Sequence, residues 1–588
     1  MPDLPKSDYT ILSKFKSLSE KYGNAHMLTE NVLINDPEFL RSAELIFEEY
    51  KSLLPKYLQD IFISSKTSLY FVMIALENWR RSLNSLINEY PVDEIVFTEI
   101  LRQDFYLPFY EAEGEVTKPL SYEPYDFVSL ALYNFVKSQY PAIKITVVKE
   151  HSKLKLRKRI FVRRYVLLLL KVLLQAWQCL KAVTFSLKKD RRAEPVIFLS
   201  RGVAHSQYVV DYVKEFRDQS ELYISDGLRT IGKNAGFLSN YNLSEDDFIN
   251  STDKSSIFTF IGSAWQVLLI LLKYKLFYKR KLKSLDKKYG ASYSSSVTEM
   301  IIHYLETHVY VANLEVLVRQ EKARNNLPKA LITCEIYTQY TYFIAKLGSK
   351  YNIKTIQLIS VAMNTAALPQ YFFCDKVLFN QVRVMDEFKQ NHPYLASKCA
   401  YWGNLTFNES QAVKVRKSIA EKLSVVVFSQ PVIDEENDFV ILDCLREIKQ
   451  TRPLEILVKQ HPREKPEKFS DYTNDIKIFS GTDSLNKVVE QADLAIVKFS
   501  AVEHYLLNYG IPTIYCAFSQ IARSSIANIT ETGYKGIAYT PQELKELVIN
   551  FPAIAPEYTE FRKEEMFKRF ENKGIFSFNE NLVKYINE

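Results

Sequence analysis

The sequence predicts an α/β protein whose parallel sheets carry helices on both faces. Two observations support this fold class. Apolar runs rich in Val, Ile and Leu alternate with helical patterns along most of the 588 residues. These runs are nearly continuous, as in strands that are buried on both faces, and polar turns follow them. A length of 588 residues, with 47% hydrophobic and 25% charged residues, suits a globular chain of two or three domains.

The composition excludes several other classes of protein. Glycine is scarce, with 15 residues, and neither GxGxxG nor GxxxxGK[ST] occurs, which disfavours a glycine-rich phosphate loop. The six cysteines are widely spaced without CxxC, which argues against a zinc knuckle or a disulfide framework and suits a reducing cytoplasm. The first residues, MPDLPKSDYT, are polar and do not resemble a signal peptide.

Residues 1–190 are predicted to form an α/β extension that ends in a basic amphipathic helix. Residues 1–90 have mainly helical patterns. The run DEIVFTE (93–99) indicates a strand, 126–140 a helix and AIKITVVKE (142–150) a second strand.

The first of two similar α/β blocks is predicted over residues 191–405. It begins with a strand, a polar loop and a helix in 195–216, followed by the strand LYISDG. A strand-helix-strand pattern occupies 329–360, and DKVLFN (375–380) is the next strand.

The second block is predicted over residues 406–588, after a crossover at YWGNLTF. Its strands are SVVVFSQP, LEILVKQHP, DIKIFSG, DLAIVKFS and IPTIYCA, with helices between them and a helical tail. Two such blocks indicate two Rossmann-like domains facing across a cleft, where ligands bind outside the carboxyl ends of the strands.

Positive charge is concentrated beside two apolar helical runs. The net charge is +7, and basic residues cluster in 153–164 and 273–288, next to the apolar runs 165–185 and 255–272. One interpretation is two buried helices with basic ends. We favour helices that lie on an anionic membrane surface, through 153–185 and 255–288, with Trp177 and Trp265 at the interface. Nucleic acid fits less well, because the basic runs adjoin aliphatic helices.

Three motifs at strand ends could carry chemistry. Asp226 follows the strand 221–224 in Ser-Asp-Gly and could accept a proton as a general base. His461 follows the strand LEILVK, within a motif that also contains Lys459, Pro462 and Arg463. Ser500 opens a helix, whose free N–H groups can hold an anion. The last two motifs suit a leaving phosphate, on which negative charge develops during the reaction.

Each of these residues also has a purely structural interpretation. Asp-Gly is common in turns, a serine commonly caps a helix, and a lone histidine at a strand end is more often structural. Weaker candidates are polar residues in other loops. Acceptor-side contacts are possible for His205, Ser206, Glu335 and Asn364, and a nucleotide-loop contact for Gln430.

Together, Ser225-Asp226-Gly227, the His-Pro motif at 461–462 and the later serine resemble motifs of bacterial sialyltransferases. Those enzymes and related capsule and lipopolysaccharide transferases have the GT-B fold, and the resemblance covers about 195–550. It implies that Asp226 is the general base, that His461 assists the CMP phosphate and that Ser500 contacts it. It also implies a CMP-activated nonulosonic acid donor, inversion at the anomeric centre and no metal cofactor. Ser225 stands where the family has a first acidic residue.

The sequence therefore predicts a cytoplasmic glycosyltransferase, peripheral on the inner face of a membrane, with a surface glycan or lipid-linked acceptor. Three alternatives remain open. The first is a GT-B transferase with another donor, such as Kdo or a nucleoside-diphosphate sugar. The second is a CDP-alcohol phosphotransferase of the teichoic-acid type. The third is an inactive membrane scaffold that recruits a partner through residues 1–190.

Overall fold

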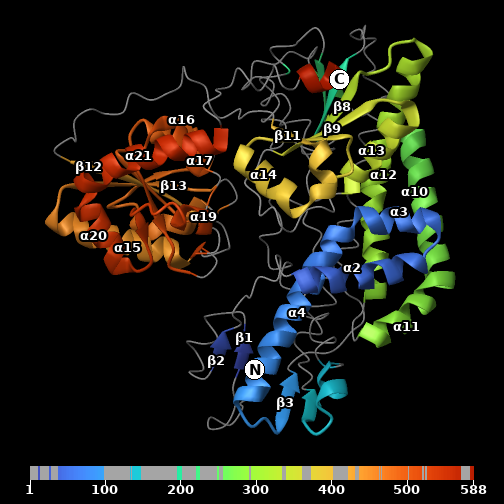
Figure 1. Cartoon of the computed structure of the whole chain (residues 1–588), viewed down its shortest axis with the longest axis horizontal. Helices are drawn as coiled ribbons and strands as arrows, with labels where there is room; N and C mark the ends of the chain where they lie inside the picture. The colour runs from blue at the N-terminus through green and yellow to red at the C-terminus, as the bar shows by residue number, and fades with distance from the viewer. Residues whose placement is uncertain are drawn as a thin grey trace. The chain divides into compact units, whose positions relative to one another are not determined.

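The computed structural model describes a subset of the chain, which forms two compact units (Figure 1). Among the described residues, the first unit extends to Val377 and the second begins at Leu378. The described residues are 11–13, 25–27, 37–97, 133, 135–147, 195–200, 213, 220–224, 248–250, 256–289, 293–333, 339–359, 372–401, 422–430, 436–461, 464, 466–481, 483–498, 500, 502–519, 522–523, 526–570 and 583–587.

The first large sheet has seven strands in the order β11-β10-β9-β8-β5-β6-β7. The chain runs outward from β5 to β7 and then returns to β8, on the other side of β5. The point at which the direction reverses therefore lies between β5 and β8, which are parallel. The strands are β5 (Val196–Ser200), β6 (Ser220–Ile224), β7 (Phe248–Asn250), β8 (Ala330–Thr333), β9 (Lys354–Ile359), β10 (Lys376–Phe379) and β11 (Cys399–Tyr401).

The second large sheet has six parallel strands in the order β14-β13-β12-β15-β16-β17. The chain passes from β12 to β13 and β14 on one side and then returns to β15 on the other side of β12. The switch point of this sheet therefore lies between β12 and β15. This is the Rossmann strand order, and it confirms the predicted pair of Rossmann-like sheets. The strands are β12 (Leu423–Phe428), β13 (Leu454–Lys459), β14 (Lys477–Phe479), β15 (Leu494–Val497), β16 (Thr513–Cys516) and β17 (Ile537–Ala538).

Helices cover both faces of the second sheet, which explains its continuous apolar strands. In β12, Val425 and Val427 pack with α15 and α20, whereas Val426 and Phe428 belong to the core on the other face. Since successive side chains point to opposite faces, all six positions of β12 are buried. The helices and turn that follow the strands of this sheet are α15 (Glu436–Thr451), the 3₁₀ turn Pro466–Tyr472, α16 (Leu485–Val489), α17 (Val502–Tyr509), α19 (Ala527–Thr530), α20 (Pro541–Ile549) and α21 (Phe551–Phe570). The helix α14 (Val382–Asn391) and the 3₁₀ turn Pro393–Lys398 lie in the chain between β10 and β11 of the first sheet.

The N-terminal helices share one apolar core with the helices that lie between β7 and β8 in the chain. Phe47, Phe62, Tyr274 and Met300 are all buried in this core. The Asp286 carboxylate accepts hydrogen bonds from the Tyr50 hydroxyl at 2.8 Å and from the Ser294 N–H at 3.1 Å. These helices are α2 (Pro37–Ser52), α3 (Lys56–Ser64), α4 (Lys66–Glu89), α10 (Ser256–Lys273), the π-helical turn η4 (Tyr274–Tyr278), α11 (Lys279–Tyr289) and α12 (Tyr293–Ala323). The next helix, α13 (Gln339–Tyr351), lies between β8 and β9 in the chain.

Two small parallel pairs complete the described strands. The strand β3 (Glu94–Phe97) pairs with β4 (Lys144–Val147), which agrees with the strands expected near 93–99 and 142–150. Short strands β1 (Ile11–Ser13) and β2 (Ala25–Met27) form the other pair.

Acidification is expected to destabilise the folded chain through His308, which lies between α10 and α12. Its ring stacks on Tyr304 with centroids 5.1 Å apart, and Nε2 lies 2.9 Å from Gln266 Oε1 of α10. Burial lowers the pKa of His308, and the negative charge of Glu315 offsets this only in part. The unfolded chain, with a histidine pKa of about 6.5, therefore takes up a proton before the folded chain does.

Stability is thus expected to fall as the pH drops below about 6.5. The measurement is the melting temperature at pH 7.5 and pH 5.5 for the wild type and for His308→Gln. The loss on acidification should be smaller in the variant, and equal losses would contradict this assignment.

Candidate functional site

The carboxyl ends of three neighbouring strands meet at the switch point of the second sheet. Ser429 and Gln430 follow β12, His461 lies two residues after β13, and Ser500 lies three residues after β15. The order β13-β12-β15 places these ends along one edge. Ligands of open parallel sheets bind outside this edge, so the fold places three of the predicted residues, Gln430, His461 and Ser500, where a ligand is expected.

A buried cluster of four charged side chains lies behind these strand ends. Lys468 Nζ is 2.7 Å from Asp438 Oδ2 and 2.6 Å from Glu464 Oε1. Lys498 Nζ is 2.6 Å from Asp438 Oδ1. The four side chains are at most 5% exposed, and their two positive and two negative charges balance. This pairing compensates for the loss of water around each charge.

The cluster also holds the backbone of the candidate site. The His461 N–H donates to Glu464 Oε2 at 2.8 Å, and the Ser429 hydroxyl donates to the same oxygen. The Gln430 N–H donates to Asp438 Oδ2 at 3.3 Å, and the Gln430 carbonyl accepts from Lys468 Nζ at 3.2 Å. The segments that follow β12, β13 and β15 are therefore fixed to one another through buried ion pairs.

Lys459 has a structural role in this arrangement. Its buried ammonium donates to the carbonyls of Gln460, Ser480 and Gly481 at 3.0, 2.8 and 3.0 Å. A lysine has three N–H donors, so these bonds leave Lys459 none for a phosphate. Burial lowers the pKa of Lys459, and the carboxylates of Asp483 and Glu464 oppose that shift. The expectation that Lys459 binds the donor phosphate is corrected accordingly: it joins the ends of β13 and β14.

Ser500 lies just before the first turn of α17. Its Oγ accepts a hydrogen bond from the Val502 N–H at 3.3 Å, and its carbonyl accepts one from the Glu503 N–H at 3.1 Å. This is the capping geometry that the sequence allowed. A serine hydroxyl that accepts one hydrogen bond still carries a proton to donate, so capping and contact with an anion are compatible.

Seven predicted site residues lie outside the described residues, namely Asp226, Pro462, Arg463, His205, Ser206, Glu335 and Asn364. The strands that precede several of them are described. Asp226 comes two residues after the end of β6, and Glu335 comes two residues after the end of β8. His205 and Ser206 follow β5, which flanks the switch point of the first sheet together with β8. Their roles stay predictions from the sequence.

Sequence reasoning missed most of the buried cluster. No role was predicted for Asp438, Glu464, Lys468 or Lys498. Lys498 carried a usable signal, because a single charge directly follows the apolar strand LAIV. Asp438 and Lys468 carried none, since only the fold brings α15 and the 3₁₀ turn at 466–472 together.

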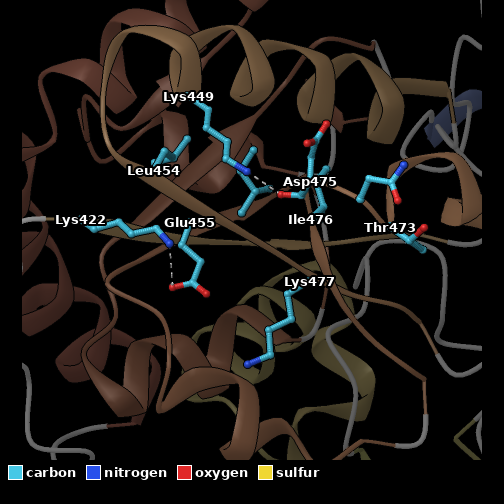
Figure 2. Close-up of a pocket in the computed structure, with 10 residues that line it drawn as sticks. Lys422, Lys449, Leu454, Glu455, Thr473, Asp475, Ile476 and Lys477 are labelled. Carbon is cyan, nitrogen blue, oxygen red and sulfur yellow. Dashed lines mark hydrogen bonds and ion pairs between the residues drawn. The ribbon is translucent and has the colours of Figure 1, made fainter.

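A surface depression of about 290 Å³ lies at the opposite edge of the same sheet (Figure 2). Its lining includes Leu454 and Lys477, the first residues of β13 and β14. Lys449 Nζ donates to the Asp475 carbonyl at 2.7 Å, as Figure 2 shows. This depression is at the amino ends of the strands, so it is not the site expected from the topology. Within the described ranges, no three His, Cys, Asp or Glu side chains are placed to hold a metal ion.

Comparisons with known proteins give only distant structural likenesses. No family model matches the chain, and no curated protein matches it. A glycosyltransferase from Rickettsia africae has 10% identity and a TM-score of 0.42, covering 68% of this chain and 98% of that one. The UDP complex of S. aureus MnaA has 9% identity and a TM-score of 0.42, covering 67% and 96%. UDP-GlcNAc 2-epimerase from Neisseria meningitidis, bound to UDP-GlcNAc, has 10% identity and a TM-score of 0.41, covering 67% and 99%.

Proposed function

We propose that this chain is an inverting glycosyltransferase of the GT-B class that uses a nucleotide-activated sugar. The observation that supports it most is the edge formed by Gln430, His461 and Ser500 at the switch point of a Rossmann-ordered sheet. Nucleotides bind at such edges, where helix N-termini and polar side chains meet phosphates. The distant structural neighbours include glycosyltransferases and proteins bound to UDP or UDP-GlcNAc, which agrees with this class.

For the donor we propose a CMP-activated nonulosonic acid, on the basis of the resemblance of the three motifs to sialyltransferases. The acceptor would be the hydroxyl of a surface polysaccharide or lipid-linked glycan. In that reaction Asp226 takes the proton of the acceptor hydroxyl. The acceptor oxygen then forms a bond to the anomeric carbon. The bond from that carbon to the phosphate oxygen breaks, and CMP leaves with the electron pair.

The leaving phosphate gains negative charge as this bond breaks. His461, Arg463 and the N-terminus of α17 at Ser500 are proposed to stabilise that charge. Pro462 would fix the backbone between His461 and Arg463. In this proposal the contacts on the acceptor side come from His205, Ser206, Glu335 and Asn364, and no metal takes part.

Nucleotide binding tests the donor class directly. CMP is expected to raise the melting temperature more than UDP or GDP at equal concentration, because a ligand that binds only the folded state stabilises it. His461→Ala should reduce the rise in melting temperature that CMP causes. Tyr394→Gln alters an exposed residue that is not among the candidate site residues, and it should leave that rise unchanged.

Other outcomes point to the alternatives. A larger shift with UDP or GDP would favour a GT-B transferase with another donor. A larger shift with CDP, with phosphorus gained by the product, would favour the CDP-alcohol phosphotransferase. Absence of any nucleotide shift would favour the inactive scaffold and contradict the proposal.

A further inference from the structure

Exposed apolar side chains are concentrated on one helix of the first unit. Among the described residues, fifteen large hydrophobic side chains are exposed, and eight of them lie in α10 and η4. Phe258, Trp265, Leu276 and Phe277 are 76%, 61%, 68% and 62% exposed. Isolated exposed hydrophobic residues are ordinary on protein surfaces, whereas a continuous patch usually marks an interaction site. The full set is Phe258, Ile261, Trp265, Leu268, Leu269, Leu272, Leu276 and Phe277.

These side chains form a stripe along the helix, which we call the α10 stripe. Its members from Phe258 to Leu276 recur at spacings of three and four residues, as on one face of an α-helix. The opposite face carries Phe260, Val267, Ile270 and Tyr274, all of which are buried. Figure 1 shows α10 beside α12 in this unit. The core therefore accounts for one apolar face of α10 and leaves the stripe without a function in folding.

The charges of the same helical segment are almost all positive. Residues 256–289 contain eight Lys or Arg and one acid, Asp286. Asp286 is directed inward, where it bonds Tyr50 and Ser294. Lys279 is half-buried, and Arg280, Lys281 and Lys283 are exposed. An apolar stripe that continues into a basic surface is the pattern of a helix that lies on an anionic lipid surface.

We propose that the α10 stripe docks in the plane of an anionic bilayer, with the basic residues of α11 on the lipid headgroups. The helical segment Phe258–Tyr289 contains an 18-residue window with a mean hydropathy of 1.4, which is long and apolar enough to span a membrane by length and composition alone. Spanning would remove Val267, Ile270 and Tyr274 from the core that they share with α12 and would break the contact between Gln266 and His308. In-plane docking keeps both, because it uses only the side chains that the fold leaves exposed.

Charge complementarity favours lipid over a second copy of this chain. A second copy carries the same basic α11, whose one acid, Asp286, is directed inward, so the segment offers no matching negative charge. The apolar run 165–185 of this chain is an equally poor partner for the α10 stripe, because the adjoining residues 153–164 are also strongly basic. An anionic membrane offers both apolar depth and the opposite charge. This proposal does not depend on the catalytic activity proposed above.

Flotation with vesicles tests the proposal on the full chain. The wild type should float with vesicles of 70% phosphatidylcholine and 30% phosphatidylglycerol, and less with pure phosphatidylcholine. Replacing Lys279, Arg280, Lys281 and Lys283 by Gln should weaken binding to the anionic vesicles roughly 10³-fold at low salt. A matched control replaces four exposed basic residues elsewhere in the first unit, Lys322, Arg324, Lys346 and Lys350, and should leave binding nearly unchanged.

The apolar part has its own variant. The triple substitution Trp265→Gln, Leu268→Gln and Leu272→Gln should also abolish flotation while the melting temperature stays near that of the wild type, since all three side chains are exposed. Tyr394→Gln with Ile549→Gln removes two exposed hydrophobic residues elsewhere and should have no effect on flotation.

Three results would overturn the proposal. The first is flotation that is indifferent to both sets of substitutions. The second is a wild type that does not float but forms a dimer by light scattering, which the triple substitution dissociates. The third is protein that stays in the vesicles after both 1 M salt and alkaline carbonate, which would indicate a spanning helix.

Discussion

Asp226→Asn is expected to lower the rate of sugar transfer by about 10²–10⁴-fold, the usual contribution of a general base. Asparagine has the size of aspartate and can make similar turn hydrogen bonds, but it cannot accept the proton of the acceptor hydroxyl. Donor binding and the melting temperature should therefore stay near those of the wild type. The measurement is single-turnover transfer from the CMP-activated sugar, together with the nucleotide-dependent thermal shift.

The neighbouring residue supplies the matched control for this variant. Ser225→Ala changes the position before Asp226 and should reduce transfer far less, because only Asp226 is proposed to be the general base. His461→Ala should differ from both, since it should lower turnover and also weaken donor binding. If Asp226→Asn transfers at the wild-type rate, Asp226 is a turn residue. If Asp226→Asn instead melts well below the wild type and loses donor binding, the role of Asp226 is structural. The general base must then be sought among His205 and Glu335.

Asp438→Asn is expected to lower the local free energy of unfolding of the second unit by about 3–5 kcal/mol, the usual cost of breaking a buried ion pair. The substitution keeps the shape of the side chain and removes the carboxylate that lies 2.6–2.7 Å from the ammonium groups of Lys468 and Lys498. Lys498 then stays buried without this counter-charge. Hydrogen exchange of the buried amides in β12 and β13 measures the effect locally, which suits a chain of two units.

The helix α15 provides its own control. Asp443 is exposed on the same helix and accepts a hydrogen bond from the Tyr472 hydroxyl at 3.0 Å, so Asp443→Asn should cost below about 1 kcal/mol. Adding Lys498→Met to Asp438→Asn should recover part of the lost free energy of unfolding, because it removes the buried positive charge that Asp438 no longer neutralises. Equal protection of β12 and β13 in the wild type and in Asp438→Asn would show that the four charges do not stabilise the sheet as a unit.

The sequence by itself determined the α/β class, most of the strands and the strand-end position of three candidate site residues. Continuous apolar runs such as LSVVVF and LEILVK have the composition of strands that are buried on both faces, and the polar residues after them fall at the carboxyl ends. Gln430, His461 and Ser500 could be placed because a strand, its end and the following turn are neighbours in the chain. The apolar and basic character of 255–288 was equally visible, because it too is a local property.

Only the tertiary structure decided which charges meet and which face of α10 remains exposed. Asp438 and Lys498 are sixty residues apart, and they pair because β12 and β15 are neighbours at the point where the strand order reverses. Lys459 looked like a phosphate ligand in the sequence, yet three backbone carbonyls from two segments surround its ammonium. In α10, apolar residues occur around most of the helix, so periodicity could not separate the core side from the exposed side. The packing of α12 and the N-terminal helices against Val267, Ile270 and Tyr274 buries that side of the helix. Trp265 and the other residues of the α10 stripe therefore stay at the surface.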